Sequence, residues 1–157
     1  MKTRIFSILC ENVPGVMMRI SRCFTRRQIN IDSITVGIEP SGLARVILSF
    51  QADDRITEHL RRVLERLIPI VNVEIIDPER AAVREIVLFK SRRLDDREVM
   101  ELVQKVEEKG GRILEVKDGI VIAELSGEHF KVEEALKDLS PYLREVARSG
   151  QVYLSRE

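Results

Sequence analysis

One order of hydrophobic patterns occurs twice along this chain, and this repeat limits the possible folds more than any single motif. The first copy predicts a strand over 3–10, a helix opening at Pro14, strands over 29–38 and 43–51, a helix from Asp53 or Asp54 to Leu67, and a strand over 70–76. The second predicts a strand over 85–90, a helix opening at Asp95 or Asp96, strands over 112–116 and 120–126, a helix near Glu128, a strand over 143–147, and a tail strand near 151–154. The repeat therefore predicts an α+β protein of two βαββαβ ferredoxin-like units, 1–78 and 79–157, with helices on one face of each antiparallel sheet.

Composition excludes several classes of function. Lys plus Arg and Asp plus Glu are 26 each, so there is no net charge to attract nucleic acid. No apolar run approaches the ~20 residues of a membrane helix, and the charged amino terminus does not resemble a secretory signal. We therefore expect a cytoplasmic protein with neither a nucleic-acid nor a membrane partner.

The cysteines and histidines do not predict a metal site or a catalytic site. Cys10 and Cys23 lack a C-x-x-C spacing, and we expect both to be core thiols. His59 and His129 lie in separate helical stretches without a matching ligand, and we expect both to be exposed. Nor does the chain contain a paired nucleophile and base or a phosphate-binding glycine loop, so we expect no catalytic residues.

The stretch 10–37 carries the most unusual chemistry. Pro14 suits the first helical position, and Gly15 leaves the neighbouring backbone uncovered by a side chain. The first-turn N–H groups and the helix dipole attract an anion such as a carboxylate, and the Asn12 amide can bind beside it. This arrangement is typical of a receptor for a small zwitterion. The same residues are also typical of an ordinary strand-to-helix connection, in which Asn12 binds local backbone.

Each predicted unit is small, with exposed sheet edges. Pairing of two copies would cover such an edge, and a cleft between the copies would lie near the helix start at Gly15. We therefore expect a dimer in which ligand binding and assembly are coupled.

Five segments resemble the small, regulatory subunit of acetolactate synthase (acetohydroxyacid synthase). They are E-N-V-P-G-V at 11–16, I-N-I-D-S-I-T-V-G at 29–37, G-L-A-R at 42–45, V-R-E-I-V-L-F-K at 83–90 and E-V-A-R-S-G-Q-V-Y-L-S-R at 145–156. The resemblance spans the whole chain, and the first unit is similar to an ACT domain, a fold shared by many amino-acid sensors.

The resemblance implies a non-catalytic subunit that activates a large catalytic subunit and confers feedback inhibition by valine or a related branched-chain amino acid. Thiamine diphosphate and magnesium are then expected on the catalytic subunit, where FAD is a further candidate, and no cofactor is expected on this chain. In the family the effector lies between two ACT domains. This implies Asn12, Gly15 and Val16 from one copy and Asn30 and Ile31 from the other.

Several residues depart from the family pattern. Gln28 stands where the family usually has Gly, so a non-glycine residue must accept the backbone angle of that turn. Ile29 replaces a common aromatic residue, Ala44 replaces a common Ser, and the loop over 39–42 is shorter than usual. These departures leave the identity of the effector open. The alternative function is a free-standing ACT-type amino-acid sensor or transcriptional regulator.

Overall fold

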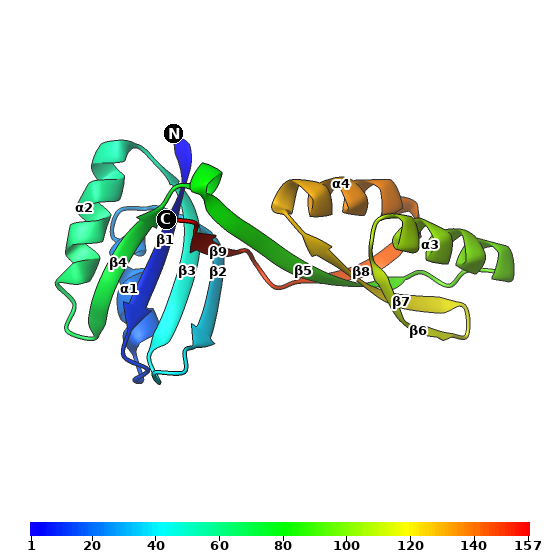
Figure 1. Ribbon diagram of the computed structural model, residues 1–157, viewed down its shortest axis with the longest axis horizontal. Helices are drawn as coiled ribbons and strands as arrows, with labels where there is room; N and C mark the ends of the chain where they lie inside the picture. The colour runs from blue at the N-terminus through cyan, green and yellow to red at the C-terminus, as the bar shows by residue number, and fades with distance from the viewer. The chain divides into compact units, whose positions relative to one another are not determined.

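The structure, a computed structural model, describes residues 1–157 and divides into two compact units (Figure 1). The first unit comprises 1–82 together with 151–157, and the second comprises 83–150. Each unit contains a four-stranded antiparallel sheet with two helices, which confirms the predicted α+β fold.

The first unit has the element order βαββαβ. Its elements are β1 (Lys2–Cys10), α1 (Val16–Thr25), β2 (Ile31–Ile38), β3 (Ala44–Ala52), α2 (Asp54–Glu65) and β4 (Ile70–Ile76), followed by a 3₁₀ turn η1 (Pro78–Arg80). The strands lie in the order β2-β3-β1-β4, so β2 and β4 are the two edges. Both helices cover the same face (Figure 1). The side chain of Asp53 caps α2 by accepting a hydrogen bond from the Ile56 N–H at 2.8 Å.

Three phenylalanines hold α1 against the first sheet. Phe6 on β1, Phe24 on α1 and Phe50 on β3 are all at least 99% buried. Their rings pack edge to face, with centroids 4.8 Å apart for Phe6 and Phe50 and 5.0 Å apart for Phe24 and Phe50. This cluster fixes the position of both ends of α1, and the candidate site residues lie at those ends.

The carboxyl-terminal tail belongs to the first unit. Strand β9 (Val152–Ser155) lies on the face of the first sheet away from the helices (Figure 1). It pairs with β5, and the Arg156 N–H donates to the Arg80 carbonyl at 2.9 Å. Ile5 and Ile47, which point to this same face, are buried. The carboxyl-terminal tail therefore covers part of the sheet face opposite the helices.

The second unit repeats the same topology. Its elements are β5 (Ala81–Ser91), α3 (Asp96–Glu108), β6 (Arg112–Lys117), β7 (Ile120–Gly127), α4 (His129–Leu139), a 3₁₀ turn η2 (Ser140–Tyr142) and β8 (Leu143–Arg148). The strand order is β6-β7-β5-β8. Asp95 and Glu98 form a capping box at the start of α3. Asp118 and Gly119 both have positive φ, as the predicted Asp-Gly hairpin turn requires.

Two expectations from local patterns need correction. Helix α1 begins at Val16 rather than at Pro14, because Gly15 has a φ of 87° and cannot be part of a helix. In α2 the buried face includes Thr57, whereas Ile56, assigned to the apolar stripe by its spacing, is 36% exposed.

The chain passes from the first compact unit to the second within β5, and the expected domains 1–78 and 79–157 stay a prediction. The charged segment after Pro78, expected to separate the units, forms η1 and the first residues of β5, which runs unbroken from one unit into the other. The tail 151–157 joins the first unit because β9 makes its contacts there. No helix in the structure is both long enough and apolar enough to cross a membrane.

The phenylalanine cluster predicts a large and specific loss of stability. Phe24→Ala should lower the free energy of unfolding by about 3 to 5 kcal/mol, because it removes a ring that is 1% exposed and leaves a cavity. Phe130→Ala is the matched control, since Phe130 is 72% exposed and its replacement should change stability by less than about 0.5 kcal/mol. Denaturant unfolding followed by circular dichroism measures both. Equal losses would contradict the assignment of this core.

Candidate functional site

The start of α1 is uncapped. Gly15 occupies the N-cap position in a left-handed conformation, and no side chain accepts a hydrogen bond from the first turn. A Cβ atom placed on Gly15 would meet no atom within 4 Å, so the space in front of the helix start is open. Val16, the first helical residue, is buried in the core and anchors the turn. The Val16 N–H donates to the Val13 carbonyl at 3.5 Å, whereas the N–H groups of Met17 and Met18 have no such partner, and together with the positive end of the helix dipole they favour an anion.

Two exposed asparagines flank α1 at opposite ends of the sheet. Asn12 follows β1, whose last residue Cys10 lies in the same cross-strand row as Ile38 at the end of β2. Asn30 precedes Ile31 at the start of β2. The length of β2 separates the two rows by roughly 20 Å at ~3.3 Å per residue. The structure therefore places Asn12, close in sequence to Gly15, at one end and Asn30 with Ile31 at the other, and one chain does not bring the two groups together.

The turn after α1 adopts a backbone angle that favours glycine, although no glycine stands there. Gln28 has a φ of 55°, in the left-handed region that side chains rarely adopt. The Ile29 N–H returns to the Phe24 carbonyl at 3.0 Å and closes the turn. The expectation that a non-glycine residue must accept this angle is therefore confirmed.

Strand β2 is an unpaired edge with exposed apolar side chains. Its only neighbour is β3, so its outer N–H and C=O groups have no strand partner. Ile34, Val36 and Ile38 are 39%, 51% and 57% exposed. Their register opposite core residues such as Val46 places them on the helix-covered face of the sheet. The edge thus combines open hydrogen-bonding groups with an apolar border.

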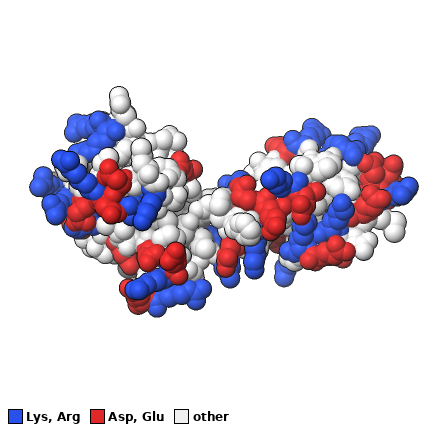
Figure 2. All heavy atoms as spheres, turned by 90° about the horizontal axis from the view of Figure 1, so that it is seen from above, with Lys and Arg blue, Asp and Glu red and all other residues white.

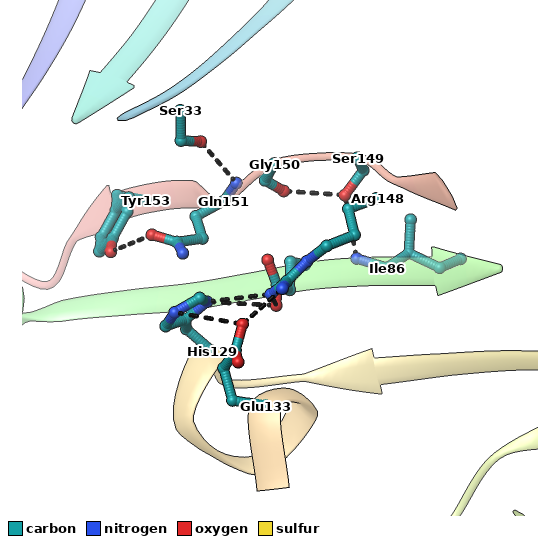
Figure 3. Close-up of polar contacts among 10 residues, drawn as sticks. Ser33, Ile86, His129, Glu133, Arg148, Ser149, Gly150, Gln151 and Tyr153 are labelled. Carbon is teal, nitrogen blue, oxygen red and sulfur yellow. Dashed lines mark hydrogen bonds and ion pairs between the residues drawn. The ribbon is translucent and has the colours of Figure 1, made fainter. Parts of the chain in front are cut away.

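An ion-paired cluster around one buried carboxylate in the second unit was not predicted from the sequence (Figure 3). The Glu85 side chain on β5 is 2% exposed, and its carboxylate accepts a hydrogen bond from Arg148 on β8 at 2.5 Å. Arg148 also binds Glu133 on α4, and His129 Nδ1 lies 3.3 Å from the Glu85 carboxylate. The hydrogen bond from Arg148 lowers the pKa of Glu133.

The same cluster ties together two segments that carry the family resemblance. Glu85 belongs to the segment 83–90 and Arg148 to the segment 145–156. Next to them, the Ser149 Oγ accepts from the Ile86 N–H at 3.0 Å, and the Ser149 N–H donates to the Ile86 carbonyl at 3.0 Å. The two ends of the second unit are therefore bonded to each other within that unit. The sequence offered no clear signal for this pair, because β5 also contains Arg84 and Lys90 and β8 also contains Arg144 and Glu145.

The tail also contacts the candidate dimer edge within the first unit. The Gln151 N–H donates to the Ser33 Oγ on β2 at 3.3 Å, and the Tyr153 hydroxyl donates to the Gln151 side chain at 2.8 Å (Figure 3). Tyr153 is 8% exposed. Thus the segment 145–156 also reaches the segment 29–37.

The cysteines are free and buried, as expected, and burial raises the pKa of the Cys10 thiol. His59 and His129 are both exposed residues, also as expected. The structure contains no group of three or more His, Cys, Asp or Glu side chains arranged to hold a metal ion.

Two family models together cover most of the chain. Residues 6–72 match the AHAS small subunit-like ACT domain, and residues 84–157 match the small subunit of acetolactate synthase. The second match includes the tail 151–157, which the structure places in the first unit.

Relatives and a solved structure give the same result over the full length. The chain is 34% identical over 156 residues to the probable acetolactate synthase small subunit of Methanothermobacter thermautotrophicus, covering 98% of this chain and 93% of that protein. It is 32% identical over 157 residues to the acetolactate synthase small subunit of Mycobacterium bovis, covering 99% and 93%. The crystal structure of the small subunit from Thermotoga maritima superposes with a TM-score of 0.92 at 35% identity, covering 100% of this chain and 99% of that chain.

The Arg148–Glu133 ion pair predicts a pH-dependent contribution to stability. Because the pKa of Glu133 is lowered in the folded protein, the pair stabilises the protein above the ordinary glutamate pKa of ~4.3 and is lost as the pH falls through the lowered value. Glu133→Gln should therefore lower the melting temperature at pH 7, and the difference from wild type should shrink towards about pH 3. Glu134→Gln, an exposed neighbour on the same helix, is the control for net charge. A difference that stays constant with pH would contradict the prediction.

Proposed function

The chain belongs to the family of acetolactate synthase small subunits, and we propose that it is the regulatory, non-catalytic subunit that activates the catalytic subunit and confers inhibition by valine or a related amino acid. Membership of this family places it in branched-chain amino-acid biosynthesis and implies a large catalytic subunit as its partner. In this proposal the protein acts in the cytoplasm. Thiamine diphosphate chemistry belongs to the partner.

The observation that carries the proposal is the uncapped start of α1. A free amino acid presents a carboxylate, an ammonium group and a side chain. The open N–H groups at Gly15 suit the carboxylate, and the exposed Asn12 side chain, which can donate and accept, suits the polar end of the ligand. Val16 lies in the core directly behind this helix start, and the exposed aliphatic side chains of the β2 edge supply apolar surface for an aliphatic side chain. A branched-chain amino acid matches this combination.

The ligand site is completed by a second copy. Within one chain Asn30 lies at the far end of the sheet from Asn12, so one small molecule cannot contact both. If two β2 edges pair antiparallel, Ile31 of one copy lies beside Ile38 of the other. That pairing carries the second copy's Asn30 towards the end of the sheet where Asn12 and the helix start lie. The paired edges would also cover the apolar border of β2.

Inhibition by the amino acid then follows from thermodynamic linkage between ligand binding and the arrangement of the two copies. An amino acid bound between two copies stabilises the arrangement of β2 edges that it bridges, and it shifts any equilibrium with other arrangements by its difference in affinity. Coupling of this kind is typically worth about 1 to 3 kcal/mol, enough to change the activity of the partner severalfold. The amino acid therefore needs no contact with the catalytic subunit.

Calorimetric titration with valine, leucine and isoleucine tests the effector site. We expect one of the three to bind, and we expect Asn12→Ala to weaken that binding by roughly tenfold or more through loss of a hydrogen bond to a charged group. Asn72→Ala is the matched control, because Asn72 is an exposed asparagine on the other edge strand, β4. In the reconstituted enzyme, Gly15→Asp should weaken inhibition but preserve activation, since it places a carboxylate where the ligand carboxylate should lie. Full valine sensitivity in this variant would show that the site lies elsewhere.

Charge placed on the β2 edge tests the dimer. Val36→Lys should convert the protein to a monomer and abolish amino-acid binding, because a lysine on an edge strand opposes pairing with a second copy. Val71→Lys provides the control, since Val71 is 57% exposed on the opposite edge strand. Sedimentation velocity measures both. A dimer that survives Val36→Lys but not Val71→Lys would assign the interface to β4.

A further inference from the structure

The helix-covered side of the first unit carries six arginines without a carboxylate partner. No Asp or Glu oxygen lies within 4 Å of their guanidinium groups, whereas Arg4, Arg61 and Arg62 of the same unit are all ion-paired. We refer to the six as the arginine face: Arg19, Arg22, Arg26, Arg27, Arg55 and Arg66. Figure 2 shows one view of this unit, with basic side chains prominent around the end that carries α2.

The arginine face borders two hollows that α1 and α2 line together. One, of about 340 Å³, is lined by Arg19, Arg22 and Arg26 from α1 and its C-cap and by Arg66 from the end of α2. The other, of about 800 Å³, is lined by Arg27 and Arg55, by the apolar side chains of Ile29 and Ile56, and by two carboxylates that are already engaged: Asp53 caps α2, and Glu58 pairs with Arg61 and Arg62. The positive charges are therefore gathered around concave surface.

The sequence of α1 maintains this positive charge at a cost to the helix. Residues 14–28 contain four arginines and no acidic residue. Arg19, Arg22 and Arg26 are spaced by three and four residues, so like charges are neighbours on the helix surface and disfavour it by a few tenths of a kcal/mol per pair. The negative end of the helix dipole offsets this at Arg22 and Arg26 but not at Arg19. A binding partner with negative charge would explain why the cluster is present.

One guanidinium of the face is held in place by uncharged groups. Arg27 donates to the Cys23 carbonyl at 3.0 Å and to His59 Nε2 at 2.8 Å. Because a guanidinium cannot accept, the imidazole must accept through Nε2. Arg27 is thus fixed at the wall of the larger hollow while its charge remains unneutralised within the chain.

The spread of the charges favours an extended partner over a single small anion. Arg19 and Arg26 lie about 10 Å apart along α1 at ~1.5 Å per residue, and Arg27 and Arg55 lie around a second hollow, so the charges spread over more than one binding point. Exposed apolar side chains accompany them, with Ile68 at 89% and Met18 at 65% exposure. Arginine together with apolar side chains is typical of protein interfaces. The surface fits a protein segment that carries several acidic residues and some apolar ones.

We propose that the arginine face is the surface through which this subunit binds an acidic segment of its catalytic subunit. The inference rests on the proposed function, because that function supplies the partner. It also suggests how the two sites communicate. Arg27 and Ile29 line the larger hollow, and Asn30 follows directly in the same turn. An amino acid bound at Asn30 therefore acts on a turn that belongs to the partner-binding surface.

Titration of the purified catalytic subunit with the full-length protein tests the proposal. The concentration for half-maximal activation should rise roughly tenfold or more in Arg22→Glu/Arg26→Glu, because the reversed charges repel an acidic segment. The control is Arg112→Glu/Arg144→Glu, which makes the same change in net charge on exposed, unpaired arginines of the second unit. It should change the concentration for half-maximal activation by less than about twofold. Raising salt from about 50 to about 300 mM should weaken the wild type severalfold and the first double variant much less. Arg66→Glu, on the other helix, should act in the same direction.

Binding is measured by sedimentation as well as by activity. A wild-type protein that binds the catalytic subunit without activating it would refute the proposed function but leave the arginine face supported, provided that Arg22→Glu/Arg26→Glu still weakens binding. Equal binding by the two double variants, each with wild-type circular dichroism, would overturn the arginine face as the partner surface. A second result would also overturn it: the isolated protein binds inorganic pyrophosphate, and Arg22→Glu/Arg26→Glu abolishes that binding while activation is unchanged. The arginine face would then serve a small anion.

Discussion

The packing of three phenylalanine rings determines where everything of functional interest lies in the first unit. Phe24 on α1 meets Phe6 and Phe50 on adjacent strands, so the helix cannot slide or rotate without opening a cavity. The uncapped start at Gly15 and the turn that leads to Asn30 are consequently fixed at opposite ends of one short helix. A rigid element thus connects the two halves of the proposed effector site.

In the proposed effector site, that geometry makes assembly part of ligand recognition. Because α1 and β2 both run the length of the sheet, the groups suited to an amino acid cannot converge within one chain. A symmetric partner solves this by presenting its opposite end. Edge strand β2 is open for such a partner, and its exposed aliphatic side chains gain from being covered. The arginine face occupies the helix side of the same unit, which leaves the β2 edge available to a second copy.

Long-range contacts explain why the resemblance extends to the end of the chain. The carboxyl-terminal segment supplies Arg148 to the buried Glu85 in the second unit and then supplies β9 to the first. Removing Arg148 would leave the buried Glu85 carboxylate without its ionic partner, which is destabilising. The segment thus closes one unit and completes the other.

The sequence alone determined the order of strands and helices and placed the starts of α2 and α3 at Asp53 or Asp54 and at Asp95 or Asp96, since each depends on residues a few positions apart. Tertiary structure decided what local patterns do not contain. The left-handed Gly15 moved the helix start, the partner of Glu85 lies 63 residues away, and the tail returned to the first unit. Six arginines lie unpaired around two hollows, because charge balance depends on neighbours brought close only by folding.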